Sequence, residues 1–283
     1  MKCKICDSPS SFVFKGTVLF KYSVAYFRCS ECGFIQTEEP FWLHEAYKDS
    51  ISIYDVGVLS RALDWRTLTG KVIQKLFDPN GRFVDYGGGT GLFVRAMRDN
   101  GFDFWRYDPY SANIFARGFD VSDMPSGKDS GFEMVTALEV FEHLPDPMGE
   151  LDKILRLSDS VLFSTYVQPH PAVTPRNWSY FALEGGQHIA FYTLDALRTM
   201  AVKANMNFYT NRMDAHLLTK KNLNISSDGF IDVVRRAKGL WRLRQLLRRF
   251  RRPYGRPALT ESDQTLIYSR MRQMAELPLP PPP

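Results

Sequence analysis

Four cysteines near the start of the chain have the spacing of a metal site. Two Cys-x-x-Cys pairs, Cys3 with Cys6 and Cys29 with Cys32, hold all four cysteines of the 283 residues. Four thiolates spaced in this way can bind one tetrahedral zinc ion, and closed four-cysteine sites are structural. Apolar runs between the pairs predict short strands, so we expect residues 1–40 to form a zinc ribbon. Two disulfides or free thiols are the alternatives, and a cytoplasmic location disfavours disulfides.

A glycine-rich stretch at residues 83–91 has the composition of a ligand-binding turn. An apolar pair and Asp85 lead into four glycines within five residues, and residues 92–98 then have the pattern of an amphipathic helix. Strand, glycine turn and helix form the first unit of a nucleotide-binding α/β domain. Glycine allows the backbone to pass close to a ligand. The dinucleotide fingerprint is absent, because Leu92 stands where its last glycine would be, and a turn without a ligand is the alternative.

The string Asp-Tyr-Gly-Gly-Gly-Thr-Gly at residues 85–91 resembles motif I of the class I S-adenosylmethionine-dependent methyltransferases. The resemblance implies that Asp85, Gly87 and Gly89 bind the cofactor. Asp108 lies 19 residues after Gly89, close to where Rossmann-like domains place the acid that binds the ribose hydroxyls. A carboxylate accepts two hydrogen bonds from such a diol. Capping of the turn that follows is the alternative role.

Two later segments resemble further parts of the same family. There, the end of the third strand often gives an acid to the adenine amine and an apolar residue to the adenine face. Asp123 and Met124 take these places, after a brief strand expected at residues 119–121. The string Glu-x-x-Glu-His-Leu-x-Asp-Pro at residues 139–147 resembles the loop after the fourth strand, which lies beside the methionine moiety and the substrate. This resemblance implies that Leu138, just before the string, contacts the cofactor. Solvated or ordinary connecting loops are the alternatives.

Two of the five histidines fall where such a fold binds ligands. His143 follows the expected fourth strand, and His188 lies in a long irregular loop at residues 166–191, both at the carboxyl edge of the sheet. Histidine is the natural general base near neutral pH. The run at residues 185–193 resembles the Tyr-His-Glu-His-x-x-Tyr-Phe-Ser run of zinc-ribbon sugar C-methyltransferases, which act on nucleotide-linked keto-sugars. Their proposed base is the second histidine of the run, and His188 takes its place.

The run departs from that family at three positions. Gly185, Gly186 and Gln187 stand where the family has Tyr, His and Glu, and we find no counterpart of its large C-terminal domain. The acidic and phenolic helpers are therefore missing, which favours O-methylation over C-methylation of a keto-sugar. A loop histidine that only hydrogen-bonds to the backbone is the alternative for His188.

The elements that must position these residues alternate between strand and helix. This alternation predicts a Rossmann-like, doubly wound, mostly parallel seven-stranded sheet behind the zinc ribbon. We divide the chain into the ribbon at 1–40, a class I methyltransferase domain at 41–221 and a C-terminal region at 222–283. No secretory signal and no long apolar run is apparent, so we expect a cytoplasmic protein.

The net charge of +5 is concentrated in one segment. Residues 231–256 hold ten Lys and Arg and one acid, so the remainder of the chain carries −4. Apolar residues of the 230–250 segment fall on one helical face and arginines on the other. Such a helix docks on the body, lies on an anionic membrane surface or binds an anionic partner. Residues 277–283 are proline-rich and expected to be disordered.

These observations predict an S-adenosylmethionine-dependent methyltransferase with a small-molecule acceptor, foremost a sugar hydroxyl of a nucleotide-sugar or glycan precursor. His188 is the expected general base, His143 the second candidate, and zinc is structural. An RNA methyltransferase that grips phosphates with the ribbon and the basic helix is the alternative. The acidic body and the absence of an Asn-Pro-Pro-Tyr motif weigh against RNA. A catalytically inactive binding module is a third option.

Overall fold

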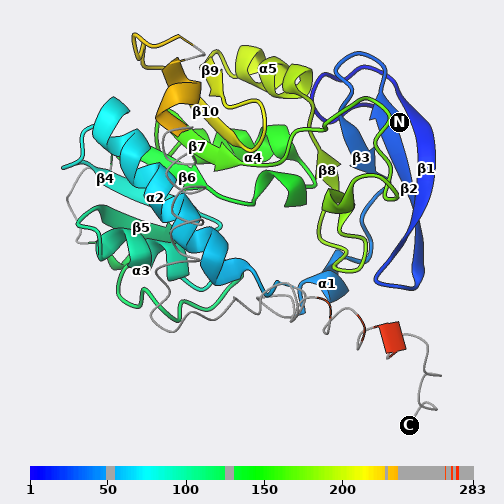
Figure 1. Cartoon of the computed structure of the whole chain (residues 1–283), viewed down its shortest axis with the longest axis horizontal. Coiled ribbons are helices and arrows are strands. Elements are labelled where there is room, and N and C mark those ends of the chain that lie inside the picture. Colours follow the sequence, from blue (N-terminus) through cyan, green and yellow to red (C-terminus); the bar gives the residue numbers. More distant parts are fainter. Residues whose placement is uncertain are drawn as a thin grey trace, which may run out of the picture.

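The structure, a computed structural model, describes residues 1–48, 55–124, 131–226 and 229–234, together with residues 265, 269, 272 and 273. Two sheets organise this part of the chain, a large central sheet and a smaller N-terminal sheet beside it (Figure 1). Among the described helices, none has the length and apolar character needed to cross a membrane.

The large sheet has six strands in the order β5-β4-β6-β7-β10-β9. The first four are parallel, and β10 runs antiparallel to both of its neighbours. All residues of β6 and β7 are buried, as expected for parallel strands covered on both faces. The predicted mostly parallel α/β architecture is confirmed. The strands are β4 (Arg82–Tyr86), β5 (Asp103–Tyr107), β6 (Met134–Ala137), β7 (Ser160–Ser164), β9 (Asn207–Thr210) and β10 (Ala215–Thr219).

A seventh strand, predicted at residues 119–121, is not formed in the described part of the chain. Only a single parallel bridge joins Arg106 to Asp120, and the 3₁₀ helix η1 (Val121–Asp123) begins directly afterwards. The Asp120 carboxylate accepts a hydrogen bond from Arg106 and also caps η1. Local polar contacts of Asp120 therefore replace the continuation of the sheet.

Helices cover both faces of the large sheet. Helices α2 and α3 pack on one face, on a cluster that contains Phe83 and Phe104. Helices α4 and α5 pack on the other, on a cluster that also takes in Phe34 and the N-terminal cysteines. The second cluster thus joins the large sheet to the N-terminal region. The helices are α1 (Leu43–Ala46), α2 (Val58–Leu76), α3 (Leu92–Arg98), α4 (Pro147–Leu155) and α5 (Leu194–Lys203), with the 3₁₀ helices η2 (Phe141–His143) and η3 (Ser179–Phe181).

The N-terminal sheet is completed by a strand from far along the chain. Its order is β1-β2-β3-β8, and the two residues of β8 pair antiparallel with β3. The long loop before β8 also adds Val173, Phe181 and Ile189 to the apolar core of this sheet. This sheet therefore includes residues from the region that we assigned to the methyltransferase domain. The strands are β1 (Ser10–Val18), β2 (Tyr22–Cys29), β3 (Ile35–Thr37) and β8 (Ala190–Phe191).

The start of the predicted amphipathic segment docks on the body. Residues 229–234 are helical, and Phe230 and Val234 are buried in the cluster beneath α2 and α3. All ten basic residues of the segment fall within 235–256, which lies outside the described residues, as does the proline-rich stretch at 277–283. Binding of this segment to a membrane surface or an anionic partner stays a prediction.

Candidate functional site

The glycine-rich turn leaves β4 at the carboxyl edge of the large sheet. Gly87, Gly89 and Gly91 all have positive φ angles, of 70°, 51° and 84°. A Cβ atom on Gly91 would lie 2.7 Å from Asn113 Oδ1, so the turn is packed tightly there. At Gly89 no atom lies within 4 Å of the corresponding position. The backbone is therefore open at Gly89, where a ligand can approach it closely.

Asp108 lies directly beside this turn. Its Oδ2 atom accepts the N–H of Gly89 at 2.8 Å, and Oδ1 accepts the N–H groups of Tyr110 and Ser111 at 2.8 and 2.9 Å. The carboxylate thus caps its own turn and also links that turn to the glycine loop. A carboxylate oxygen has two lone pairs, so Oδ1 is fully engaged by its two N–H donors, whereas Oδ2 retains one acceptor position for a ribose hydroxyl. This open backbone and adjacent acid fit the adenosyl part of S-adenosylmethionine.

Asp85 is buried beneath the turn. Its Oδ1 atom accepts the Thr136 hydroxyl at 2.6 Å, and only 3% of the residue is exposed. Burial raises the pKa of the Asp85 carboxyl to about 7; the charge of Asp108 acts in the same direction, and Thr136 and Arg106 act against it. A Cβ atom on Gly88 would lie 3.0 Å from Asp85 Oδ2. Asp85 therefore supports the turn from below.

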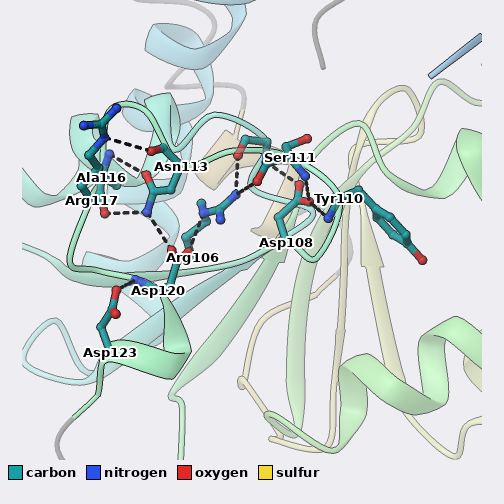
Figure 2. A network of polar contacts seen from close by, with 10 residues as sticks. Arg106, Asp108, Tyr110, Ser111, Asn113, Ala116, Arg117, Asp120 and Asp123 are labelled. Atoms are coloured by element: carbon teal, nitrogen blue, oxygen red, sulfur yellow. Dashed lines mark hydrogen bonds and ion pairs between the residues drawn. The ribbon is translucent and has the colours of Figure 1, made fainter. Parts of the chain in front are cut away.

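Arg106 organises the same region (Figure 2) and was not anticipated from the sequence. The guanidinium is buried and donates to Asp120 Oδ1 at 2.6 Å, to the Gly89 carbonyl at 2.6 Å and to the Ser111 carbonyl at 3.0 Å. Asn113 donates to the second Asp120 oxygen. One side chain thus joins the glycine turn, the Asp108 turn and the segment before η1. The only sequence signal was a cationic residue between the two aromatic residues Trp105 and Tyr107 of strand β5.

The remaining predicted cofactor residues lie around the same strand ends. Asp123 is exposed, and its Oδ2 accepts the Asp120 N–H, so one oxygen is engaged in the capping of η1. Met124 packs partly against the core beneath α4 and α5. Leu138 follows β6 and packs partly against the core beneath α2 and α3. Their contacts with a cofactor stay predictions.

Glu139 has an unusual backbone next to Leu138. Its φ of 56° is in the left-handed region, which is strained for a residue other than glycine and is often found at functional sites. Its carboxylate pairs with Arg61 of α2 at 2.7 Å, and Arg61 also pairs with Asp55 at 2.6 Å. Burial raises the pKa of Glu139 to about 7, against the effect of Arg61. These contacts tie the start of α2 to the loop after β6.

His143 and His188 lie together, although they are 45 residues apart. Their ring centroids are 4.9 Å apart. Nδ1 of His143 lies 3.0 Å from the Gln187 carbonyl, and Nδ1 of His188 lies 2.6 Å from the Tyr180 carbonyl. A carbonyl can only accept, so each Nδ1 carries the hydrogen and each Nε2 of the neutral ring carries the lone pair. Each histidine can therefore hydrogen-bond to the main chain through Nδ1 and still act as a base through Nε2.

Glu142 completes this group, which we call the histidine cluster (Glu142, His143, Tyr180 and His188). Glu142 is 1% exposed and accepts the Tyr180 hydroxyl at 2.6 Å. Burial raises the pKa of Glu142, against the effects of His188 and Tyr180. Burial also lowers the pKa of both histidines to about 4. Glu142 lies in the Glu-x-x-Glu-His string, so its place in the sequence was visible but its role was not.

The loop that carries His188 is held by the N-terminal region. Four hydrogen bonds join the segment 183–189 to residues more than 140 positions earlier in the chain. In three of them the N-terminal region donates: the Leu19 N–H to the Leu183 carbonyl at 3.0 Å, Trp42 Nε1 to the Gly186 carbonyl at 2.7 Å and the Thr37 N–H to the Ile189 carbonyl at 3.2 Å. In the fourth the loop donates, from Gln187 Nε2 to the Ala46 carbonyl at 2.8 Å.

The histidine cluster and the glycine turn follow neighbouring strands. The cluster is reached from the end of β6, which pairs with β4. A Cβ atom on Gly87 would lie 2.8 Å from Val140, so the loop after β6 packs directly against the turn after β4. In open α/β sheets this carboxyl edge is where ligands bind. One ligand-binding edge therefore carries both groups of predicted site residues.

The four cysteines lie close together, with unbonded thiols. Three sulfur pairs are 3.3 to 3.6 Å apart: Cys3–Cys32, Cys6–Cys29 and Cys6–Cys32. A tetrahedral zinc site with bonds of about 2.3 Å requires sulfur separations of about 3.8 Å. Small shifts of these side chains would therefore accommodate the ion. The Thr193 hydroxyl, which caps α5, donates to the Cys32 carbonyl and ties this cluster to the large sheet.

Solved structures that are similar to this chain share little sequence with it. An O-methyltransferase family 2 protein from Planctomyces limnophilus is 13% identical with a TM-score of 0.41, and the match covers 62% of this chain and 65% of that one. Human N-acetylserotonin methyltransferase is 16% identical with a TM-score of 0.45, over 65% of this chain and 60% of that one. An O-methyltransferase family protein from Burkholderia thailandensis is 11% identical with a TM-score of 0.44, over 64% and 68%.

The family assignment rests on a match in sequence. A search of curated proteins finds no match to the chain. The family model of the methyltransferase domain, in contrast, matches residues 61–210, which is more than half of the chain. This range contains the glycine turn, Asp108 and the histidine cluster, and the chain therefore belongs to the S-adenosylmethionine-dependent methyltransferases of class I.

Proposed function

We propose that this enzyme transfers a methyl group to a hydroxyl of a small molecule, specifically a sugar in a nucleotide-linked or glycan precursor. The observation that carries the proposal is the pairing of two sites at one sheet edge. A glycine turn with an adjacent acid follows β4, and two histidines with available Nε2 lone pairs follow the neighbouring β6 and the long loop. The first group suits a cofactor, and the second suits removal of a proton from an acceptor.

Cofactor binding is assigned to residues around the glycine turn. Gly87 and Gly89 would allow close approach of the cofactor, above the supporting carboxylate of Asp85. Asp108 would accept a ribose hydroxyl, Asp123 and Met124 would contact the adenine, and Leu138 would lie beside the methionine part. Support comes from the open backbone at Gly89 and from the hydrogen bond between Asp108 and that glycine.

Proton removal is assigned to His188. S-adenosylmethionine supplies an electrophilic methyl group on a positively charged sulfur. Nε2 of His188 would take the proton of the acceptor hydroxyl as the oxygen bonds to the methyl carbon, and Nδ1–H would stay bonded to the Tyr180 carbonyl. The bond between that carbon and the sulfur would break at the same time, and its electron pair would stay on the sulfur of the neutral demethylated product. The buried carboxylate of Glu142 favours the imidazolium that results, since its charge raises the pKa of His188. His143 lies close enough to be the second candidate.

The N-terminal cysteines are assigned a structural zinc ion. The ion would join the turn after Met1 to the end of β2 and to Cys32, just before β3. Because β3 pairs with β8, and β8 follows His188 by two residues, the ion would indirectly fix the loop of the general base. No chemistry is assigned to this metal, since all four ligands come from the chain.

Two measurements on the intact chain test the proposal. Calorimetry with S-adenosylmethionine or its demethylated product should detect binding of one molecule. Turnover should then appear in a screen of nucleotide-sugars and glycan lipids. Absence of cofactor binding would contradict the assignment of the site. Transfer to RNA, with binding that weakens steeply with salt, would contradict the choice of acceptor and favour the nucleic-acid alternative.

A further inference from the structure

Three members of the histidine cluster have the composition of a metal site. Glu142, His143 and His188 each offer one ligand atom, and these atoms all lie within 4.8 Å of one another. Within the described residues, the only other group that meets this description is the set of four cysteines. The two groups differ in chemistry, because the histidine cluster offers nitrogen and oxygen rather than sulfur.

Both histidines are oriented as metal-binding histidines are. Each Nδ1–H donates to a main-chain carbonyl, of Gln187 for His143 and of Tyr180 for His188. Metal-binding histidines almost always donate their second ring N–H to a carbonyl, a carboxylate or water, which fixes the ring and leaves the other nitrogen to the ion. Among the described residues, no hydrogen bond to either Nε2 is formed. Burial keeps both rings neutral, the form that binds metals.

Glu142 provides an independent sign that a cation is accommodated here. Its Oε1 accepts the Tyr180 hydroxyl, whereas Oε2 is buried and has no partner within hydrogen-bond distance in the described part of the chain. The Thr165 hydroxyl, which contacts Tyr180, lies near enough to lower the pKa of Glu142 but does not complete such a bond to Oε2. A buried carboxylate oxygen without a partner costs free energy, and such atoms are rare in folded proteins. A positive ion beside Oε2 would remove this cost.

We propose that Glu142, His143 and His188 form a binding site for a divalent transition-metal ion, and that the ion inhibits methyl transfer. Two imidazoles and one carboxylate suit Mn²⁺, Fe²⁺, Co²⁺, Ni²⁺ and Zn²⁺ and leave coordination positions for water. With bonds of about 2.1 Å, two ligand atoms can be at most about 4.2 Å apart. Ligand atoms that are not opposite each other on the ion lie closer still, so the three side chains, now within 4.8 Å of one another, must move inward on binding.

Inhibition is expected because the metal ion and the acceptor proton would compete for the same lone pair, on Nε2 of His188. The inference shares its residues with the proposed general base, and an ion on His188 Nε2 prevents that atom from taking a proton. Turnover should therefore fall as the site fills. The metal-binding part does not depend on the identity of the acceptor or on methyl transfer.

Binding is tested by titrating the zinc-loaded full chain with Mn²⁺ and following free Mn²⁺ by electron paramagnetic resonance. Mn²⁺ prefers oxygen and nitrogen ligands, so it leaves the four thiolates to zinc. One site is expected. Glu142→Gln keeps an acceptor for Tyr180 but removes the charge, and His143→Ala removes a ligand; each should weaken binding at least ~10-fold, the lower end of what the loss of an outer-shell partner causes.

His44→Ala is the matched control. His44 is exposed, and its Nδ1 also contacts a carbonyl, that of Phe41, but it belongs to no ligand group. This variant should bind Mn²⁺ as the parent does. Thermal unfolding of each variant establishes that it is folded. The inference is overturned if the parent binds no Mn²⁺ at millimolar concentration, or if Glu142→Gln and His143→Ala bind it unchanged.

Turnover measured during the same titration separates this inference from the proposed function. A fall that tracks occupancy supports both the site and its inhibitory role. A rise that tracks occupancy would overturn inhibition and the assignment of His188 as the base, because the ion would then be activating the hydroxyl. An absence of turnover at every Mn²⁺ concentration would bear on the proposed acceptor, and the binding curve would still decide the metal site.

Discussion

The proposed cofactor side and the proposed acceptor side of this site are built in different ways. The glycine turn, Arg106, Asp108 and Asp120 come from one short stretch of chain, and their mutual hydrogen bonds join residues at most 19 positions apart. The histidine cluster is assembled from the loop after β6 and the long loop before β8, and contacts from residues 19–46 hold the latter. One side is local in sequence, and the other depends on the tertiary fold.

This difference predicts separate sensitivities. A change in the N-terminal region should affect the proposed base before it affects cofactor binding, because residues 19–46 contact the long loop but contribute no residue to the glycine turn. Substitutions at Arg106 and Asp108 should lower cofactor affinity before they affect proton removal.

Removal of the zinc ion proposed for the four cysteines is the strongest test of this separation. Structural zinc contributes on the order of 10 kcal/mol to the folding of small zinc domains. Cys6→Ser, or treatment of the parent with a chelator, should therefore release the N-terminal sheet and abolish turnover while cofactor binding persists. Calorimetry with S-adenosylmethionine and a turnover assay provide the two readouts. Equal loss of both would show that the two sides are not independent.

Loss of the base should have the next largest effect. A positioned general base contributes ~10²–10⁴-fold, so His188→Ala should lower kcat by about that factor and leave the cofactor dissociation constant unchanged. His188→Asn keeps a polar group without a useful base and should be similarly slow.

His143→Ala serves as the comparison for that variant. It should retain more activity than His188→Ala, because His188 would still carry its Nε2 lone pair. Near-native turnover of His188→Ala together with failure of His143→Ala would reverse the assignment of the two histidines.

The buried acid of the cofactor side should make stability depend on pH. The pKa of Asp85 is raised from 3.8 to about 7 in the folded state, so the folded protein binds this proton more tightly than the unfolded chain does. Its stabilising effect is complete below pH 4 and is lost as the pH rises towards 7. At 1.36 kcal/mol per pKa unit, about 2–3 kcal/mol is lost between pH 5 and pH 8.

Asp85→Asn removes this dependence and keeps an acceptor for Thr136. Urea unfolding gives the difference in the free energy of unfolding between the variant and the parent. This difference should favour the variant more at pH 8 than at pH 5. Asp108 and Arg106, the charged groups that face Asp85, are present in both proteins and cancel in the comparison. The same difference at both pH values would show that Asp85 does not titrate in this range.

Asp108→Ala tests the cofactor side directly. Hydrogen bonds to a charged group contribute about 1.5–3 kcal/mol, so cofactor affinity should fall by roughly 10- to 100-fold. Turnover at saturating cofactor should change much less, because the histidine cluster is untouched. Asp99→Ala, at an exposed acid that pairs only with Arg95 among the described residues, is the control and should bind normally. Undiminished binding by Asp108→Ala would remove the ribose assignment.

The two sides also differ in how far the sequence revealed them. The glycine turn and Asp108 were found from their spacing, because their geometry is set by neighbours along the chain. Arg106 was missed, since a lone arginine in a strand carries no motif, and the predicted strand at residues 119–121 failed because Asp120 binds that arginine. The pairing of β8 with β3 was also missed, because two residues are too short for a strand pattern and their partner is over 150 positions away.

The acceptor side was anticipated as individual residues but not as an arrangement. His143 and His188 were selected by type and place, whereas their contact with each other and with Glu142 depends on how the long loop folds back. That loop has few regular elements, and its path is fixed by apolar packing and by hydrogen bonds from Leu19, Thr37 and Trp42. Such long-range contacts leave no periodic signal in the sequence.

Trp42 offers the finest test of this long-range support. Its buried Nε1–H donates to the Gly186 carbonyl at 2.7 Å, two residues before His188. Trp42→Phe removes that donor and leaves the carbonyl to find water, at a cost of about 1 kcal/mol. We expect a small loss of thermal stability and a several-fold fall in kcat with cofactor affinity unchanged. Trp105→Phe is the matched control, because the buried Trp105 Nε1 has no hydrogen-bond partner among the described residues. If both variants lose the same activity, the change of ring accounts for the effect, and the bond to Gly186 does not position the base.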